Sequence, residues 1–580
     1  MKNFFTLVVC FIVSVGVSWG QVTVYSQGSG LWDATDLWNT ERDGSGTYYT
    51  EPNAVDITAV IQSGHTITLP MSPVYKVDDL IVESGGTIRA GVTGNRFLSV
   101  FGDQVIIDGT AGGAGDGFSL NIDGPSCTLS GSGTMQLSRI KKDNSTMLGS
   151  SVTNFTISNC TLNLSWIGSG AIYNSSAPGP STPRTFNVTL ESGATMNVAG
   201  DISINGPNGN NSFADLGTYT FNGTANVNGN LRVRTRASAG YDIQYIINGT
   251  FNLGGEIIGN DGNSGSAVAN LTINNGGVLK VTKTGNVFTS ISSRETYTYN
   301  PGSTFEYAAI SAQNLRGFDN YQNLTTSGGG AKTLTSDATV NQTLNLLSGN
   351  IVTETYTLTL ASGGNVTNAS TASYVRTNSS GVFKRTISAS GELFPIGNSS
   401  YNPATLAGDG EYSMRVLDAV YLNGLSGGTT TNRVVNRTWD VTSDAPISGS
   451  LDLTVQWNTP HEVGSFDRTN CTVSHYTGGQ WVTGGFAAAS GGNPWTRTRT
   501  GITSLSPFAV ASLLSPLPVE LLSFNAEKRG QTARLEWRTA TEKDNDYFEI
   551  ERSAGGTAFA SIGRVKGAGT TQIPQAYAFD

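Results

Sequence analysis

Few side chains in this sequence could perform acid–base chemistry. The 580 residues include 43 Asp and Glu, 34 Lys and Arg, and only three His. Glycoside hydrolysis needs two carboxyl groups at a defined separation, and lyase chemistry needs a strong base, often beside a metal. No dense cluster of ionisable residues stands out, so we predict no catalytic residue and no cofactor. Stacking of the chain could still bring distant carboxylates together, which keeps a polysaccharide lyase or glycoside hydrolase as the alternative.

The candidate metal ligands are aspartates near Gly-rich turns. They are Asp103, Asp108, Asp116 and Asp123. Clustered carboxylates would suit calcium, but Asp is also a common turn residue, and we favour the turn role. His65 has no second His or Cys nearby, and His461 and His475 have no carboxylate partner indicated. We therefore predict no metal site.

Three tryptophans could bind a ligand, because an exposed indole ring stacks on sugars. Trp32, Trp38 and Trp166 would act in this way if they were exposed. Trp32 and Trp38 are six residues apart and share a face of an extended segment, which also fits a pair that caps a core. We favour the cap, and a carbohydrate-binding accessory protein remains a further alternative.

The cysteines indicate the compartment only weakly. Cys127, Cys160 and Cys471 follow the N-terminal apolar segment. Export would permit disulfides, and Cys127 and Cys160 could lie on neighbouring strands. Small buried Cys is common in a stacked interior, and an odd count leaves one thiol unpaired. We favour free buried thiols, and the pairing of Cys127 with Cys160 stays open.

Short alternating strands must position whatever site the chain has. The segment Asn187–Gly206, NVTLESGATMNVAGDISING, alternates apolar and polar residues and is cut by Gly-containing turns. Such alternation buries one face of a short strand. Variants recur at Leu80–Gly91, Thr220–Val233, Ile247–Gly259, Leu271–Val281 and Leu358–Val366. One such unit, which we call a rung, cannot bury its own apolar face, so the rungs are predicted to stack into a parallel β-helix-like solenoid.

Composition excludes some function classes. Charged residues make up 13% of the chain, Gly accounts for 72 residues, and the net charge is −9. This balance is typical of a turn-rich all-β protein. Nucleic-acid binding needs a concentrated basic patch, and the sequence has no basic block. No nucleic-acid partner is predicted.

The first 20 residues are predicted to be a secretory signal peptide. Lys2 is followed by an apolar stretch, Phe4–Val17, and by the small residues Ser18 and Gly20 at the −3 and −1 positions. The apolar run is shorter than the roughly 20 residues of a membrane span. We expect export, no membrane span, and a mature chain that is secreted or attached to a surface by other means.

Composition changes near Ser379, where longer strands with aromatic residues begin. Residues 376–515 are predicted to form an antiparallel β-sandwich with Trp439, Trp457 and Trp481 in its core. The expected organisation is a signal peptide at 1–20, an N-terminal β module and solenoid cap at 21–100, the solenoid at 101–375, the sandwich, and a partial fibronectin type III-like domain at 516–580.

Residues 516–580 carry the most specific resemblance to known proteins. LPVELLSF (Leu517–Phe524), LEWRTATE (Leu535–Glu542), NDYFEIERS (Asn545–Ser553) and IGRVKGAG (Ile562–Gly569) resemble the fibronectin type III-like module of cargo of the Bacteroidetes type IX secretion system. The resemblance implies successive strands around a buried Trp537, with Tyr547–Ser553 beside its strand. It also implies that further strands and a C-terminal sorting domain follow Asp580, and that the secretion machinery is a partner.

Upstream segments resemble the same class of surface protein more weakly. Trp32 and Trp38, SGHTITL (Ser63–Leu69), ESGGT (Glu83–Thr87) and NPGSTFEY (Asn300–Tyr307) are similar to its modules and rungs. From these features we predict a non-enzymatic, exported structural or adhesive protein, an adhesin-like molecule that contacts glycans or other surfaces through rows of Thr, Asn and Ser.

Overall fold

The described part of the chain is all-β, as the sequence predicts. The computed structural model describes residues 21–143, 152–166, 171–175, 184–204, 215–233, 243–259, 268–317 without 292 and 294, 320–512, and 521–580 without 554, 556–558 and 572. Within these ranges there is no α-helix, one 3-10 turn, Thr459–His461, and no helix that could cross a membrane. The predicted signal peptide lies outside them. The chain divides into two compact units between Lys332 and Thr333.

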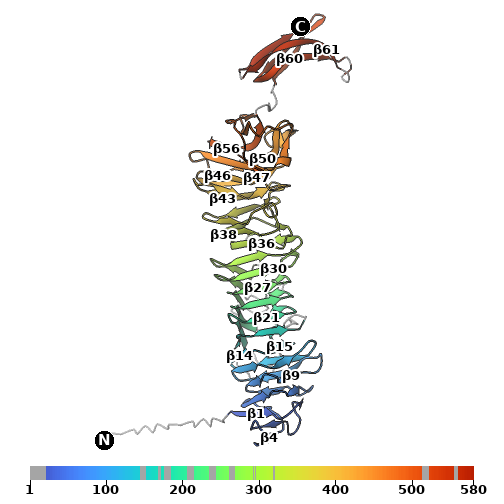
Figure 1. Cartoon of the computed structure of the whole chain (residues 1–580), viewed down its shortest axis with the longest axis vertical. Helices are drawn as coiled ribbons and strands as arrows, with labels where there is room; N and C mark the ends of the chain where they lie inside the picture. Colours follow the sequence, from blue (N-terminus) through green and yellow to red (C-terminus); the bar gives the residue numbers. More distant parts are fainter. Residues whose placement is uncertain are drawn as a thin grey trace, which may run out of the picture. The chain divides into compact units, whose positions relative to one another are not determined.

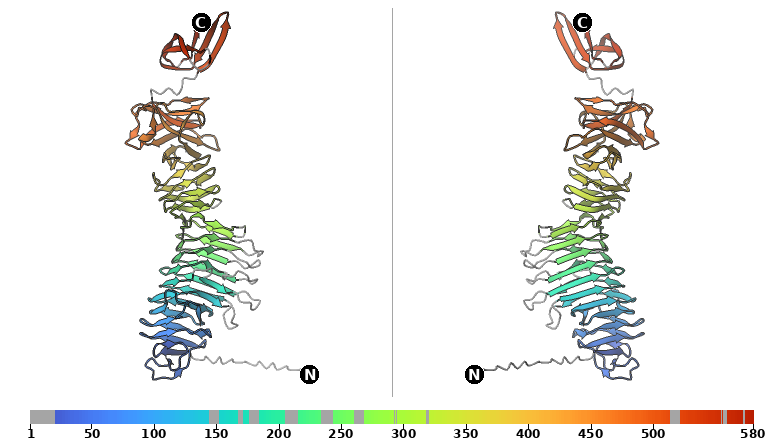
Figure 2. Two further views of the ribbon diagram at one scale, coloured as in Figure 1. Left: turned by 90° about the vertical axis from the view of Figure 1, so that its right-hand side faces the viewer. Right: turned by 90° about the vertical axis from the view of Figure 1, so that its left-hand side faces the viewer.

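Parallel sheets build the first unit (Figures 1 and 2). The first sheet consists of β1 (Val22–Ser26), β5 (Ile57–Ile61), β8 (Leu80–Val82), β11 (Gln104–Ile107), β14 (Ser126–Ser130), β17 (Val152–Ile157), β20 (Arg184–Leu190), β23 (Asp215–Phe221), β26 (Ile243–Ile247), β29 (Ala269–Ile273) and β33 (Glu295–Tyr299). The second sheet consists of β2 (Gly30–Leu31), β6 (Thr66–Thr68), β9 (Thr87–Arg89), β12 (Thr110–Gly112), β15 (Thr134–Leu137), β18 (Thr161–Leu164), β21 (Thr195–Val198), β24 (Thr224–Val227), β27 (Thr250–Leu253), β30 (Val278–Val281), β34 (Thr304–Tyr307) and β36 (Asn320–Thr326).

Shorter parallel sheets complete each rung. One contains β7 (Tyr75–Val77), β10 (Arg96–Val100), β13 (Phe118–Ile122), β16 (Ile140–Asp143) and β19 (Ile172–Ser175). Another contains β22 (Ile202–Ser203), β25 (Leu231–Arg232), β28 (Ile257–Ile258) and β32 (Phe288–Thr289). A third pairs β31 (Gly285–Asn286) with β35 (Gln313–Leu315). Three consecutive strands thus each join a different sheet. Each of the next three strands then pairs with the preceding strand of its own sheet.

Alternating residues explain why these strands form. In β21 the apolar Met196 and Val198 are buried, whereas the polar Thr195 and Asn197, which alternate with them, are half-buried. Aromatic side chains also contact each other between rungs on the buried side of the first sheet: the rings of Phe186 and Tyr219 meet edge to face, with centroids 6.3 Å apart. Burial of one face of every strand is the main stabilising term of such a stack.

Glycines at the corners allow the rungs to approach each other closely. A Cβ atom on Gly223 would lie 2.3 Å from the carbonyl oxygen of Ala194 and 2.4 Å from that of Glu191. Gly193 adopts a φ of +90°, a conformation that favours glycine. Asparagines also connect neighbouring rungs at these corners: Asn248 Nδ2 donates a hydrogen bond to Asn222 Oδ1 at 2.7 Å.

The N-terminal tryptophans are buried, as the favoured cap interpretation predicts. Trp32 and Trp38 are both fully buried, and their ring centroids are 4.9 Å apart. Trp38 Nε1 donates to the carbonyl oxygen of Trp32 at 2.8 Å. Beside them, β3 (Trp38–Asn39) and β4 (Tyr48–Tyr49) add antiparallel strands to the first sheet. These two indoles therefore offer no face to a sugar.

Pairing changes from parallel to antiparallel within the second unit, beyond β37 (Lys332–Leu334). The parallel strands are β38 (Ala338–Leu346), β40 (Thr357–Leu360), β41 (Asn365–Thr367) and β43 (Val382–Ile387), with β39 (Ile351–Val352), β42 (Val375–Arg376) and β45 (Ile396–Gly397). One antiparallel group contains β43, β47 (Gly410–Leu417), β50 (Val434–Thr442), β52 (Glu462–Val463), β53 (Cys471–Thr477), β54 (Gln480–Val482) and β57 (Pro507–Ser512). Another contains β44 (Glu392–Phe394), β46 (Ala404–Ala407), β51 (Leu451–Trp457), β55 (Ser490–Gly491) and β56 (Trp495–Ile502), and β48 (Val420–Asn423) pairs with β49 (Ser426–Thr430).

Two of the three tryptophans predicted for this core are fully buried. Trp439 and Trp457 have no exposed surface. Trp481 is only partly buried: it packs against the cluster that includes Val420 and donates from Nε1 to the carbonyl oxygen of Tyr421 at 2.9 Å.

Five strands are described after residue 520. The three-stranded group consists of β58 (Leu521–Arg529), β59 (Thr532–Thr539) and β62 (Gln575–Phe579), and β60 (Glu542–Arg552) pairs with β61 (Ala560–Thr571). Trp537 is 3% exposed, which confirms its predicted burial, and its ring stacks on Tyr577. The prediction that Tyr547–Ser553 pairs beside Trp537 is wrong, because β62 occupies that position.

Candidate functional site

Two of the four candidate aspartates, Asp108 and Asp116, bind backbone N–H groups through their side chains. Asp116 accepts hydrogen bonds from the backbone N–H groups of Ala90, Gly91 and Phe118 at 2.8–2.9 Å. Asp108 in the same way accepts from the backbone N–H of Ser132 at 2.9 Å. Over the described ranges, no group of three or more His, Cys, Asp and Glu is placed to hold a metal ion.

His461 contacts Ser400. A histidine and a serine can act together as general base and nucleophile. The Nε2 atom of His461 lies 3.1 Å from Ser400 Oγ. Its Nδ1 accepts from the backbone N–H of Asn458 at 3.3 Å, so we assign the ring proton to Nε2, which donates to Ser400. A general base needs the opposite tautomer, and Arg437 Nη2 also donates to Ser400 Oγ at 2.9 Å. Burial, with the charge of Arg437, lowers the pKa of His461 to about 4. The cluster is a structural network.

The other two histidines have separate surroundings. His475 stacks on Phe508 with centroids 4.6 Å apart. His65 Nδ1 lies 2.8 Å from Ser26 Oγ, but Ser26 is fully buried and accepts from the backbone N–H of Gln62. A substrate has no access to a buried hydroxyl of this kind.

All three described cysteines are free and buried. Burial raises the pKa of the Cys160 and Cys471 thiols to about 11 and raises that of Cys127 further. Because the thiolate is the nucleophilic form, none of them is an activated nucleophile. The structure thus favours the buried-thiol interpretation over a bond between Cys127 and Cys160.

Trp166 is half-buried and has one face covered. The guanidinium of Arg139 lies 3.3 Å from the centroid of the Trp166 ring. Arg139 is itself 8% exposed, and burial lowers its pKa. A cation over the indole stabilises both groups and leaves only the other ring face for stacking on a sugar.

The strongest candidate site lies on the outward side of the second sheet. Four consecutive strands, β18, β21, β24 and β27, begin with the pattern Thr-x-Asn. Their register aligns the four asparagines in one row, which we call the amide row: Asn163, Asn197, Asn226 and Asn252. The four threonines form a second row beside it. Neighbouring strands are about 4.8 Å apart, so both rows are regular.

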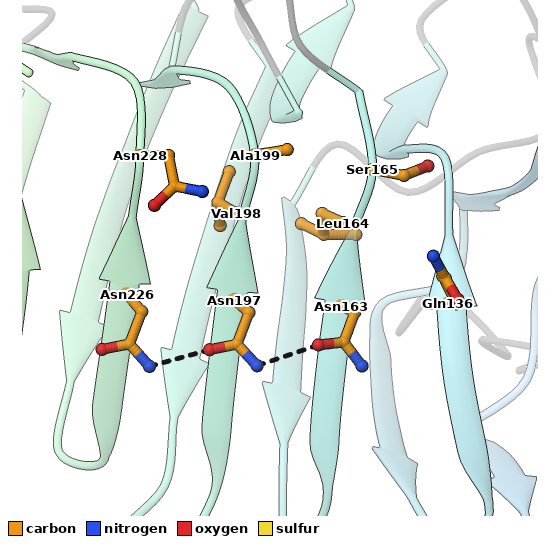
Figure 3. A pocket seen from close by; sticks show the side chains of 9 residues that line it. All are labelled: Gln136, Asn163, Leu164, Ser165, Asn197, Val198, Ala199, Asn226 and Asn228. Carbon is orange, nitrogen blue, oxygen red and sulfur yellow. Dashed lines mark hydrogen bonds between the residues drawn. The ribbon is translucent and has the colours of Figure 1, made fainter. Parts of the chain in front are cut away.

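Hydrogen bonds fix the orientation of every amide in the row (Figure 3). Asn197 Nδ2 donates to Asn163 Oδ1 at 2.8 Å, and Asn226 Nδ2 donates to Asn197 Oδ1 at 2.7 Å. Asn252 Nδ2 continues the row onto Asn226 at 2.7 Å, and Asn163 Nδ2 ends it on the carbonyl oxygen of Met135 at 3.1 Å. All four Nδ2 atoms therefore donate toward lower-numbered rungs.

A hollow of about 430 Å3 borders the amide row. Its lining consists of Gln136, Asn163, Leu164, Ser165, Asn197, Val198, Ala199, Asn226 and Asn228. Figure 3 shows the three asparagines on one side and Ser165, Ala199 and Asn228 on the other. The lining groups are amides, a hydroxyl and apolar carbons, which can bind a polar ligand but cannot transfer a proton at neutral pH.

Two carboxylates on rungs near the hollow, Asp201 and Glu256, are held in ion pairs. Asp201 is 7% exposed and accepts from Arg232 Nε at 2.6 Å. Glu256 pairs with Lys283 at 3.1 Å. Neither Asp201 nor Glu256 is among the described residues that line the hollow.

No protein-family model, curated protein or solved structure matches the chain. The amide row therefore rests on the structure and the sequence pattern alone. The rows of Thr and Asn were expected in general terms, but their location was not. The signal that would have located them is the tetrapeptide Thr-x-Asn-x, which recurs at Thr161, Thr195, Thr224 and Thr250.

Proposed function

We propose that this chain is an exported surface or extracellular protein that binds glycans through the amide row and the adjoining hollow, without catalysis. In this proposal the parallel sheets form a β-solenoid, which an antiparallel sandwich and a fibronectin type III-like module follow. The motifs of residues 517–569 make the chain a candidate cargo of the type IX secretion system, whose machinery would then be its partner.

The regularity of the outward rows supports a binding role. Many weak contacts to a repeating ligand add up when the protein presents its groups at a constant spacing. An exported protein that presents aligned hydroxyls and amides is suited to ligands with aligned hydroxyls, and polysaccharides are the most common of these outside the cell.

The observation that carries the proposal is the fixed orientation of the amide row beside the hollow. Amides held by their neighbours lose little conformational entropy when a ligand binds. Less of the binding free energy is therefore offset by the cost of ordering these side chains. A ligand that lies in the hollow can reach Asn163, Asn197 and Asn226 at the same time.

Binding of the purified chain to a panel of immobilised polysaccharides tests the proposal. We expect at least one polysaccharide to bind, Asn197→Leu to weaken that binding about tenfold, and no new reducing ends to form. Asn187→Leu is the matched control, because Asn187 bonds to Asn154 on the first sheet in the same way. Absence of binding to every member, or turnover of one, would contradict the proposal.

A further inference from the structure

We infer that the hollow takes a neutral polysaccharide, extended along the amide row and across the strands, and that it discriminates against anionic chains. This inference rests on the proposed function and adds the chemical class of the ligand and its direction on the protein. Three properties of the site carry it: the unused donors and acceptors, the absence of charge among the described lining residues, and the repeat.

The unused groups of the amide row match hydroxyls. Each primary amide has two N–H donors and two carbonyl lone pairs. In Asn163, Asn197 and Asn226 the row uses one donor and one lone pair. Each of these three amides, which line the hollow, therefore has one N–H and one lone pair that the row does not use. A hydroxyl group both donates and accepts, so it satisfies both, whereas a carboxylate or sulfate accepts only and would face the Oδ1 lone pair unpaired.

The bonding fixes this arrangement against rotation of the amides. Rotating Asn197 by half a turn about its last bond would place its oxygen against Asn163 Oδ1 and its Nδ2 against Asn226 Nδ2. Both hydrogen bonds, at 2.8 and 2.7 Å, would be lost. The row therefore cannot present all its N–H groups to an anion by flipping one amide.

The lack of charged groups among the described lining residues also disfavours an anionic ligand. None of the nine described lining residues is charged. The amide row is continued on the second sheet by Lys280 and Glu306, but these pair with each other at 2.8 Å. Binding of polyanions depends on unpaired cations and on a favourable field, and the net charge of the chain is −9.

The repeat indicates how the ligand lies. The hollow spans four rungs, from Gln136 on β15 to Asn226 on β24, or three steps of about 4.8 Å each. One sugar residue of an extended chain has nearly the length of one step. A chain laid across the strands therefore places one residue at each rung, and affinity should rise with oligosaccharide length until the hollow is filled.

Matched polymer panels test the inference. The probes are neutral glucans, mannans, xylans and galactans, and anionic polygalacturonate, alginate and dextran sulfate. We expect the neutral class to bind with an affinity that changes less than about twofold between about 0.05 and about 0.5 M salt. Oligosaccharides of the bound polymer should gain affinity with each added residue and then reach a plateau.

Variants locate the binding on the hollow. Asn197→Asp removes the donor of the central amide and adds a charge, so neutral binding should fall about tenfold or more. Asn187→Asp makes the same change on the first sheet and should leave binding unaltered. Ala199→Tyr fills the hollow and should abolish binding even if Asn197→Asp fails to fold, because Ala199 takes no part in the amide row.

The results separate this inference from the proposed function. Salt-sensitive binding of the anionic class alone, still abolished by Ala199→Tyr, overturns the inference and leaves the proposed function. Binding that survives Ala199→Tyr overturns the inference and also the location of the proposed site. Binding of no polysaccharide at all overturns both. Salt-insensitive neutral binding that Ala199→Tyr abolishes supports the inference.

Discussion

His475 carries a pH dependence that belongs to a single side chain. It is 5% exposed, and burial, with the charge of Arg499, lowers its pKa to about 4 from the ordinary value of 6.5. Between these two values the unfolded chain binds a proton that the folded chain does not. The stability that this group contributes is therefore complete above pH 6.5 and is lost as the pH falls toward 4, by about 3 kcal/mol.

We expect His475→Phe to remove this part of the acid sensitivity while retaining the stack on Phe508. Urea unfolding at several pH values between about 4 and about 7, followed by tryptophan fluorescence, measures the slope of stability against pH. Tyr476→Phe on the same strand is the control and should keep the wild-type slope. An unchanged slope in His475→Phe would show that other groups account for the acid sensitivity.

Trp537 is the residue on which the last five described strands depend. Its ring centroid lies 5.6 Å from that of Tyr577 and 5.2 Å from that of Phe548. Truncation to Ala should cost about 3–5 kcal/mol. Phe524 is opposite Trp537 on β58 but is 58% exposed, so Phe524→Ala should cost much less. Hydrogen exchange of β59 in the full chain measures the loss of stability in both variants. Equal protection of β59 in Trp537→Ala and Phe524→Ala would contradict the structural importance of Trp537.

At the scale of elements, close contact between corners limits what the rungs tolerate. A Cβ atom on Gly223 would meet two backbone carbonyls, and backbone cannot move aside as a flexible side chain can. We expect Gly223→Ala to cost about 1–3 kcal/mol. Gly113 is the control, because no atom lies within 4 Å of the place that its Cβ would take and its φ is outside the left-handed region. Gly113→Ala should change stability by less than about 0.5 kcal/mol, and thermal unfolding of both variants provides the comparison.

The sequence predicts the strands well and their distant partners poorly. Alternation in segments such as Thr195–Val198 is a local property, so the all-β class and the buried positions follow from it. The amide row depends on register between residues 26 to 34 positions apart, which no local pattern specifies. The same limit explains the error at Tyr547–Ser553: the strand that displaces it, β62, begins only at Gln575.

At the scale of the whole molecule, the first sheet begins where the signal peptide is predicted to end. Val22 pairs with Ile57, and its backbone N–H donates to the carbonyl oxygen of Asp56 at 2.9 Å. Gln21, the residue after the expected cleavage site, contacts Asp79 through its side chain. No described strand of the first sheet includes any of residues 1–20, so the expected cleavage after Gly20 would remove no part of these strands.

We expect exported protein to begin at Gln21 and to be released without a membrane anchor. Amino-terminal sequencing of material from the producing cells measures this directly. Gly20→Pro is the test variant, because it removes the small residue that the predicted cleavage site requires and lies outside the strands that start at Val22. The uncleaved variant should remain bound to the inner membrane through Phe4–Val17, with the first unit folded. Recovery of wild-type protein that begins at Met1 would contradict the export prediction and, with it, the assignment of the chain to the cell surface.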